Sequence, residues 1–267
     1  MKRRSFLTGA LIGTPLALGG ALAYGRHLER HRVEVVSVEV SIGLVRPVTV
    51  CVLGDIHFDP LYETDYLRDV VGQVNSLAPD RVWFTGDFLT RSPERLDELA
   101  EPLSEVKASL GVAAVLGNHD HWVAPDDLSE ALENVGIEVL RNRSIALPES
   151  PGWYLSGLES YWGGVPSSEN IDATAANARH ILLAHEPDPF RDLRDERVVL
   201  QVSGHTHGGQ VRVPGFGALQ LPSWGRRYQM GLYRENGRTL YVNRGVGTVD
   251  HHYRFNCPPE ITHLRLV

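Results

Sequence analysis

The stretch Val48-Thr49-Val50-Cys51-Val52-Leu53-Gly54-Asp55-Ile56-His57 decides how this 267-residue chain folds. Its first six residues form a continuous apolar run of the length typical of a buried strand. Asp55 and His57 follow directly, where that strand ends. In α/β folds the carboxyl ends of the strands converge on one crevice. This stretch therefore predicts a polar site at the end of a central strand.

The same arrangement recurs along the chain. Asp87, Asn118, His185 and His205 each come at or just after the end of a predicted strand. The five clusters are Asp55-Ile56-His57, Gly86-Asp87, Gly117-Asn118-His119-Asp120, His185, and Gly204-His205-Thr206-His207. Because strand ends meet in one crevice, we expect a single metal-rich site assembled from the whole chain.

The remaining pattern predicts a layered fold. Helical periodicity occupies residues 64–78 and Pro125–Asn134, and a further helix runs from Pro93 to about Ser109 with a distortion at Pro102. The later half is richer in strands, with an Asn-Gly hairpin signal at residues 235–238. An α/β half followed by a β-rich half predicts a four-layer α/β/β/α sandwich. We expect one catalytic domain over residues 33–267.

Charge and cysteine content narrow the function classes. The formal net charge is −7, and the residues after the first 25 carry 23 basic and 33 acidic side chains, or −10. A surface this acidic argues against nucleic acid as the main partner. The two cysteines, Cys51 and Cys257, give no zinc-ribbon or CxxC spacing. Whether they form a disulfide is left open by the sequence.

The N-terminus has the features of an export signal. Lys2-Arg3-Arg4-Ser5-Phe6-Leu7 resembles the bacterial twin-arginine motif, and the uncharged stretch Ser5–Gly25 follows. Ala21-Leu22-Ala23 offers a small-x-small cleavage site. We interpret residues 1–25 as a twin-arginine-type signal or, alternatively, a retained membrane anchor. The expected partner is the twin-arginine translocation machinery. The expected location is the periplasm or the outer face of the cytoplasmic membrane.

The five clusters, in this order, resemble the calcineurin-like metallophosphoesterase superfamily, whose pattern is DxH, GD, GNH[DE], H and GHxH. The resemblance covers nearly all of the chain after residue 45. Four further blocks resemble bacterial exported or membrane-associated members, which are related to UDP-2,3-diacylglucosamine pyrophosphatase-like proteins. These blocks are residues 183–188, 203–210, 245–248 and 254–261. The resemblance implies the metallo-dependent phosphatase fold and the hydrolysis of phosphate esters.

The resemblance also implies two metal sites that share Asp87. One metal would be bound by Asp55, His57, Asp87 and His207, and the second by Asp87, Asn118, His185 and His205. A carboxylate suits a shared position because each of its oxygens can serve one cation. Mixed nitrogen and oxygen ligands suit two divalent ions of Mn, Fe, Zn or Ni. His205 and His207 would face opposite sides of a regular strand, so they require a loop.

Catalytic roles follow from the same resemblance. His119 would protonate the leaving-group oxygen or stabilise the phosphoryl charge, and Asp120 would orient the His119 ring. A metal-bridging hydroxide would attack in line and cleave a phosphodiester or pyrophosphate bond. The alternatives are a phosphomonoesterase with the same site and a non-catalytic metal-binding protein. The substrate could be lipid-linked or a sugar nucleotide, with possible membrane association, and His251 and His252 could touch it.

Overall fold

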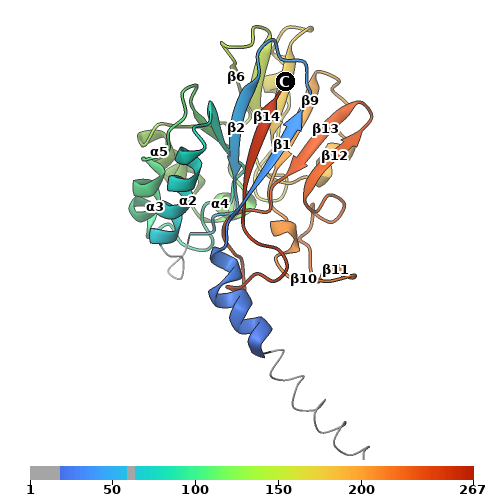
Figure 1. The fold of residues 1–267 in the computed structure, drawn as a ribbon. Helices are drawn as coiled ribbons and strands as arrows, with labels where there is room; N and C mark the ends of the chain where they lie inside the picture. The colour runs from blue at the N-terminus through green and yellow to red at the C-terminus, as the bar shows by residue number, and fades with distance from the viewer. Residues whose placement is uncertain (1–18, 59–63) are drawn as a thin grey trace, which may run out of the picture.

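Two six-stranded sheets face each other in the computed structural model, which describes residues 19–58 and 64–267 (Figure 1). The first sheet has the order β1 (Glu34–Val40), β14 (Glu260–Leu266), β2 (Val48–Leu53), β3 (Arg81–Phe84), β4 (Val112–Ala114) and β5 (Ile137–Val139). The second has the order β12 (Gly231–Glu235), β13 (Arg238–Val242), β9 (Val198–Ser203), β8 (Arg179–Leu183), β7 (Trp153–Gly157) and β6 (Arg143–Ala146). The predicted α/β sandwich is confirmed.

Burial on both faces explains why strand β2 is apolar from Val50 onward, while the half-buried Thr49 donates its hydroxyl to Asp80 Oδ2 at 2.7 Å. Cys51 and Leu53 belong to the core between the first sheet and its helices, while Val50 and Val52 belong to the core between the two sheets. Successive side chains of a strand point to opposite faces, and here both faces are buried. A polar residue at either face would lose its solvent without gaining a partner.

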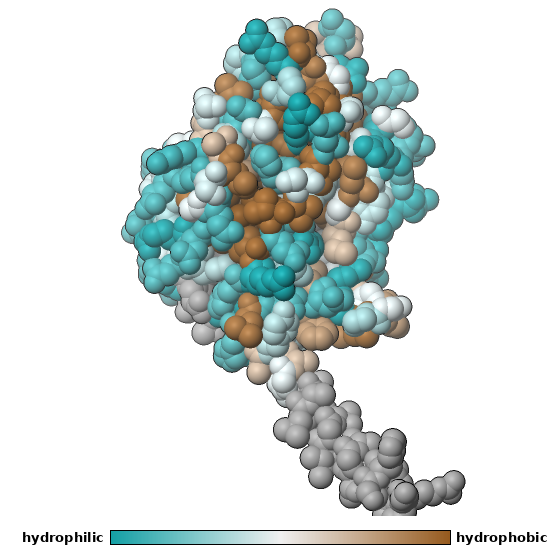
Figure 2. All heavy atoms as spheres, viewed as in Figure 1, coloured by the Kyte–Doolittle hydropathy of each residue, from teal (hydrophilic) through white to brown (hydrophobic). Residues whose placement is uncertain are grey.

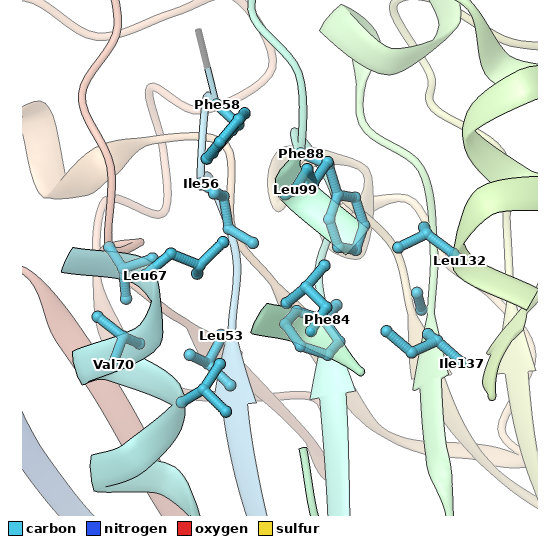
Figure 3. Close-up of a cluster of buried hydrophobic side chains, with 14 of the residues drawn as sticks. Leu53, Ile56, Phe58, Leu67, Val70, Phe84, Phe88, Leu99, Leu132 and Ile137 are labelled. Carbon is cyan, nitrogen blue, oxygen red and sulfur yellow. The ribbon is translucent and has the colours of Figure 1, made fainter. Parts of the chain in front are cut away.

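Three helices cover the outer face of the first sheet: α2 (Thr64–Ser76), α3 (Leu96–Leu103) and α5 (Pro125–Asn134). Figure 3 shows Leu67 and Val70 of α2 and Leu99 of α3 packed against the strand residues Leu53 and Phe84. The outer face of the second sheet has a thinner cover of short segments. These are α6 (Glu169–Asp172), the 3-10 turn η2 (Asp188–Arg191) and loops.

Some boundaries differ from the predicted ones. The helix expected over residues 93–109 covers only Leu96–Leu103 and ends just after Pro102. Proline lacks the N–H that a continuing helix requires, so a stop there is expected. The residues Asn118–Val123 form a short helix, α4, which the pattern of the sequence did not indicate. Strands β5 and β6 are three and four residues long, too short for a clear periodic signal.

Strand directions place the site at one end of the molecule. Strands β2, β3 and β4 run parallel to each other and antiparallel to β14, and β7, β8, β9 and β13 run parallel to each other. The carboxyl end of β2 lies at the lower end in Figure 1, where the helix of residues 19–27 leaves the domain. The twin-arginine motif, within residues 1–18, lies outside the described residues. Among residues 19–58 and 64–267, no helix has the length and apolarity required to cross a membrane.

Candidate metal centre

The backbone turns sharply just after the strands, where the motifs begin. Asp55 donates its backbone N–H to the carbonyl of Gly86 at 2.8 Å, and His57 donates to the carbonyl of Asp87 at 3.0 Å. Five of the predicted ligands have φ in the left-handed region that non-glycine residues rarely adopt. They are Asp55 (50°), His57 (51°), Asp87 (55°), His205 (72°) and His207 (52°). The expected loop at His205 and His207 is thereby confirmed.

Asp55, His57 and His207 form one cluster of possible metal ligands, and all three are buried. The Nε2 atoms of His57 and His207 lie 3.0 Å apart, and His207 Nε2 lies 3.6 Å from Asp55 Oδ1. Two nitrogens that each lie about 2.1 Å from one cation, at a right angle, are separated by about 3.0 Å. The spacing of these side chains therefore fits a shared cation.

Asp87, His185 and His205 form a second buried cluster. His185 Nε2 lies 3.1 Å from both Asp87 Oδ2 and His205 Nδ1. Asp87 Oδ2 also lies 3.5 Å from His57 Nε2 of the first cluster. One carboxylate thus contacts histidines of both clusters, as a bridging ligand would.

The protonation states of His57, His207 and Asp87 suit metal ligands, whereas burial raises the pKa of Asp55 to about 7. Burial alone would lower the pKa of His185, but the Asp87 carboxylate raises it above its usual value. Burial lowers the pKa of His57 to about 3 and that of His207 well below its ordinary value, so both rings are neutral. Burial alone would raise the pKa of Asp87, but His185 and His57 beside it bring that pKa below its usual value. Neutral imidazoles and an ionised carboxylate are the forms that bind metal.

Asn118 supplies a further sign of a metal. Its Oδ1 and Nδ2 atoms are buried and lack hydrogen-bond partners, as does Nδ1 of His57 and of His207. An unpaired buried polar group costs about 1–3 kcal/mol. A cation bound through Asn118 Oδ1 would satisfy that oxygen. The donor set of carboxylates, imidazoles and one amide oxygen fits divalent Mn, Fe, Zn or Ni.

Glycine at position 117 is required by close approach. A Cβ atom there would lie 2.1 Å from Asp87 Oδ1, a distance that no atom pair tolerates. Gly204 has a similar role, because its Cβ would lie 2.6 Å from Asp55 Oδ2. The glycines of the GNHD and GHTH clusters therefore make room for the carboxylates of other clusters.

His119 lies at the site and is half-buried. Its backbone N–H donates to Asp87 Oδ1 at 2.9 Å, and its ring meets that of His57 edge-on at 4.8 Å between centroids. Its Nδ1 lies 2.9 Å from the Thr90 carbonyl oxygen. Because a carbonyl only accepts, Nδ1 carries the proton in this contact. Nε2 is then left available for a substrate.

Asp120 has different partners from the expected ones. Its Oδ1 accepts the backbone N–H of Leu89 at 2.9 Å, and its Oδ2 accepts that of Gly117 at 2.9 Å. The Thr90 carbonyl, and not Asp120, contacts the His119 ring. Burial raises the pKa of Asp120 to about 7. Asp120 therefore connects the turn that contains Leu89 with the turn that contains Gly117.

Two ring contacts had no signal in the sequence. His185 Nδ1 donates to the Thr85 carbonyl at 2.6 Å, which turns Nε2 toward Asp87. His205 Nε2 donates to the Ser223 carbonyl at 2.7 Å, which turns Nδ1 toward His185. Backbone carbonyls of this kind fix the ring orientation of metal-binding histidines. Every residue has a carbonyl, so side-chain patterns cannot reveal which one acts.

Arg254 is the large side chain that sequence reasoning missed. It is fully buried, and its Nη2 donates to the carbonyls of Gly245 and Gly247 at 3.1 and 2.7 Å. Its Nη1 also reaches the carbonyl of the predicted ligand His207 at 3.4 Å. The guanidinium thus holds together the loops behind the first cluster. The only available signal was its place in the block 254–261.

A cavity of about 400 Å³ opens over the two clusters of possible metal ligands. His57, Asp87, Asn118, His119 and His205 form its polar floor. The remaining wall is more apolar and includes Trp162, Val211, Leu219, Leu221, Pro222, Val249, His251 and Tyr253. His251 therefore lies where a substrate could touch it. Cys51 and Cys257 are both buried with free thiols.

The fold and these clusters define a metal-dependent phosphoester hydrolase. Residues 48–209 match the family model for calcineurin-like phosphoesterases, and the chain belongs to this family. It is 31% identical to the uncharacterized metallophosphoesterase YkuE of Bacillus subtilis over 275 residues, which cover 98% of this chain and 96% of that protein. It is also 31% identical to the phosphodiesterase YaeI of Escherichia coli K12 over 280 residues, the full length of both.

A solved structure supports the fold alone. The protein TT1561 of Thermus thermophilus superposes with a TM-score of 0.50 at 12% identity and covers 75% of this chain and 91% of its own.

Proposed function

We propose that the protein is a phosphodiesterase or pyrophosphatase of the cell envelope that uses two divalent metal ions. The observation that carries the two-metal proposal is the position of Asp87. Its Oδ2 lies 3.1 Å from His185 Nε2 and 3.5 Å from His57 Nε2, so one carboxylate serves two histidine clusters. A site for one ion would not need the second cluster.

Each part of the site has a role in in-line displacement at phosphorus. Divalent cations in such a centre lower the pKa of water to near neutrality and balance the charge of the phosphate. Asn118 contributes a neutral oxygen, which leaves the centre positive enough to attract an anion. With both ring nitrogens protonated, His119 would give the Nε2 proton to the leaving oxygen and keep the Nδ1 proton, which is bonded to the Thr90 carbonyl.

The shape of the cavity favours a substrate with two substituents on phosphorus. The cavity extends beyond the polar floor to Val211, Leu219 and Leu221, which leaves space for a second group. The relative YaeI is named a phosphodiesterase. The alternative function is hydrolysis of phosphate monoesters, because the same polar residues at the bottom of the cavity would bind a monoester. A lipid-linked phosphate or a sugar nucleotide fits the mixed polar and apolar lining.

The envelope location rests on the sequence of residues 1–25. The paired arginines and the uncharged stretch after them support export through the twin-arginine machinery, with or without cleavage. Export of a folded protein would allow the metals to be acquired in the cytoplasm. Periplasmic copper or zinc would otherwise compete for these ligands.

The test combines metal content with turnover. The purified chain should contain two metal ions per molecule by elemental analysis. It should hydrolyse bis-p-nitrophenyl phosphate with Mn²⁺, Fe²⁺, Zn²⁺ or Ni²⁺ and lose this activity with a chelator. Asp87→Asn should lower both the metal content and the turnover. Full activity at one ion per chain would refute the two-metal proposal. A higher kcat/KM for p-nitrophenyl phosphate would favour the monoesterase alternative.

A further inference from the structure

The hairpin of β10 (Arg212–Val213) and β11 (Gly217–Ala218) exposes apolar side chains without an evident structural reason. Phe216 at its turn is 76% exposed, Leu219 just after it is 59% exposed, and Val213 is exposed as well. Each strand has two residues, and the hairpin projects from the lower end of the domain (Figure 1). Large apolar side chains gathered on a surface mark an interaction site.

The base of this hairpin is fixed to the metal centre. Val211 forms a β-bridge with Phe255, and Arg212 donates its backbone N–H to the carbonyl of Phe255 at 2.9 Å. The Arg212 guanidinium also donates to the carbonyl of Gly208 at 2.7 Å. Gly208 follows the predicted ligand His207 directly. The position of the hairpin is therefore tied to the metal centre.

The helix of residues 19–27 leaves the domain beside the segment of Phe255, which pairs with the hairpin. Arg254 donates its backbone N–H to the carbonyl of Gly25 at 3.1 Å, and Cys257 donates its own to the carboxylate of Glu29 at 2.7 Å. Arg254 and Cys257 flank the Phe255 that pairs with the hairpin. On the face drawn in Figure 2, a few brown apolar residues lie where this helix leaves the domain, and a larger brown area lies over the middle of the molecule. Leu22 and Leu28 are exposed on this segment.

The charge here differs from that of the whole chain. Residues 26–32 contain three arginines and one acid, Glu29, whose carboxylate is buried and bonded to Cys257. Arg26 and Arg32 are exposed and Arg30 is half-buried. The chain as a whole has a net charge of −7. Arginines beside exposed apolar side chains match a surface of anionic lipid, because basic residues near such a surface are attracted to its negative charge.

The cavity opens at this surface. Leu219 lines the cavity together with His57 and Asp87, yet it is largely exposed at the end of the hairpin. Val211, at the base of the hairpin, lines the same wall. A flat surface resting on the hairpin would thus lie across the mouth of the cavity.

We propose that the tip of the β10–β11 hairpin and the arginines of residues 26–32 form a docking surface for an anionic lipid bilayer. Phe216 enters the bilayer surface, the arginines contact lipid phosphates, and the cavity mouth faces the headgroups. This proposal rests on the proposed envelope location, but it does not depend on how many metals are bound.

The experiment places a fluorescent probe at the hairpin tip of the full chain. Phe216→Cys is labelled with a polarity-sensitive NBD group; the native cysteines are buried, and the unsubstituted chain gives the background. The matched control is Val45→Cys, because Val45 is 80% exposed in the loop between β1 and β2, at the amino end of β2 and away from the site. Both are mixed with vesicles of phosphatidylglycerol and phosphatidylcholine.

We expect the probe at position 216 to shift to the blue and to be quenched by lipids with brominated acyl chains. The shift should weaken at high salt and with pure phosphatidylcholine. The probe at position 45 should not change. Unchanged emission at 216 would overturn the proposal, even if the protein sediments with vesicles through its N-terminus. Hydrolysis of bis-p-nitrophenyl phosphate by Phe216→Cys tests the proposed function separately, because Phe216 lies outside the cavity wall.

Discussion

Replacing Gly117 by alanine tests how tightly the glycines define the metal centre. Gly117 has φ −92° and ψ −179°, which alanine adopts without strain. The cost is therefore steric alone, since the new Cβ would lie 2.1 Å from Asp87 Oδ1 and 2.7 Å from Asp87 Cγ. Reaching van der Waals contact requires a shift of about 1 Å, and misplacement by this distance costs about 100-fold in rate.

The assay is kcat/KM with bis-p-nitrophenyl phosphate at saturating Mn²⁺, beside metal content and thermal melting. The matched control is Gly72→Ala, which lies in α2 with nothing within 4 Å of the new methyl group. It should keep full activity and gain about 0.5–1 kcal/mol of stability. A Gly117→Ala protein with unchanged kcat/KM and metal content would show that the carboxylate of Asp87 does not need its present position.

Four further outcomes are expected. His119→Ala should retain its bound metal and lose about 100- to 10,000-fold in kcat, and equal turnover would refute its role as proton donor. Asn118→Ala should lower the metal content per chain, measured by elemental analysis. Arg254→Met should reduce the free energy of unfolding in urea by about 3 kcal/mol or more, because it leaves buried carbonyls unpaired. Burial alone would raise the pKa of Glu149, but its two hydrogen bonds with Arg81 hold that pKa below the usual 4.5. The stability that this pair contributes is present above pH 4.5 and is lost as pH falls through the lower pKa of the folded state. Glu149→Gln should therefore flatten the pH dependence of the unfolding free energy, measured by urea melts, in that acidic range.

The sequence predicted the centre well where chemistry is carried by side chains. Asp55, His57 and His207 belong to motifs far apart in the chain, yet the apolar runs before those motifs were enough to bring them together. The reason is topological, because parallel strands in a layered fold end at a common edge. That these residues bind metal remains a prediction, and the unpaired oxygen of Asn118 supports it.

The sequence did not predict the contacts that backbone N–H and carbonyl groups make in the site. Asp120 was expected to orient His119, but both of its oxygens accept backbone N–H groups instead. The carbonyls of Thr85, Thr90 and Ser223 fix ring orientations and leave no trace in composition or spacing. Of the cavity wall only His251 was foreseen, and its apolar members were not, because they come from loops that have no periodic pattern.

The left-handed backbone at five of the predicted ligands has a consequence for protein engineering. A residue other than glycine in this conformation costs on the order of 1–3 kcal/mol. Glycine at position 57 or 205 would relax the chain and leave no imidazole. Stability and activity are therefore opposed at these positions. A library of variants selected for heat resistance alone should lose its ligands early, whereas one screened for turnover should retain them.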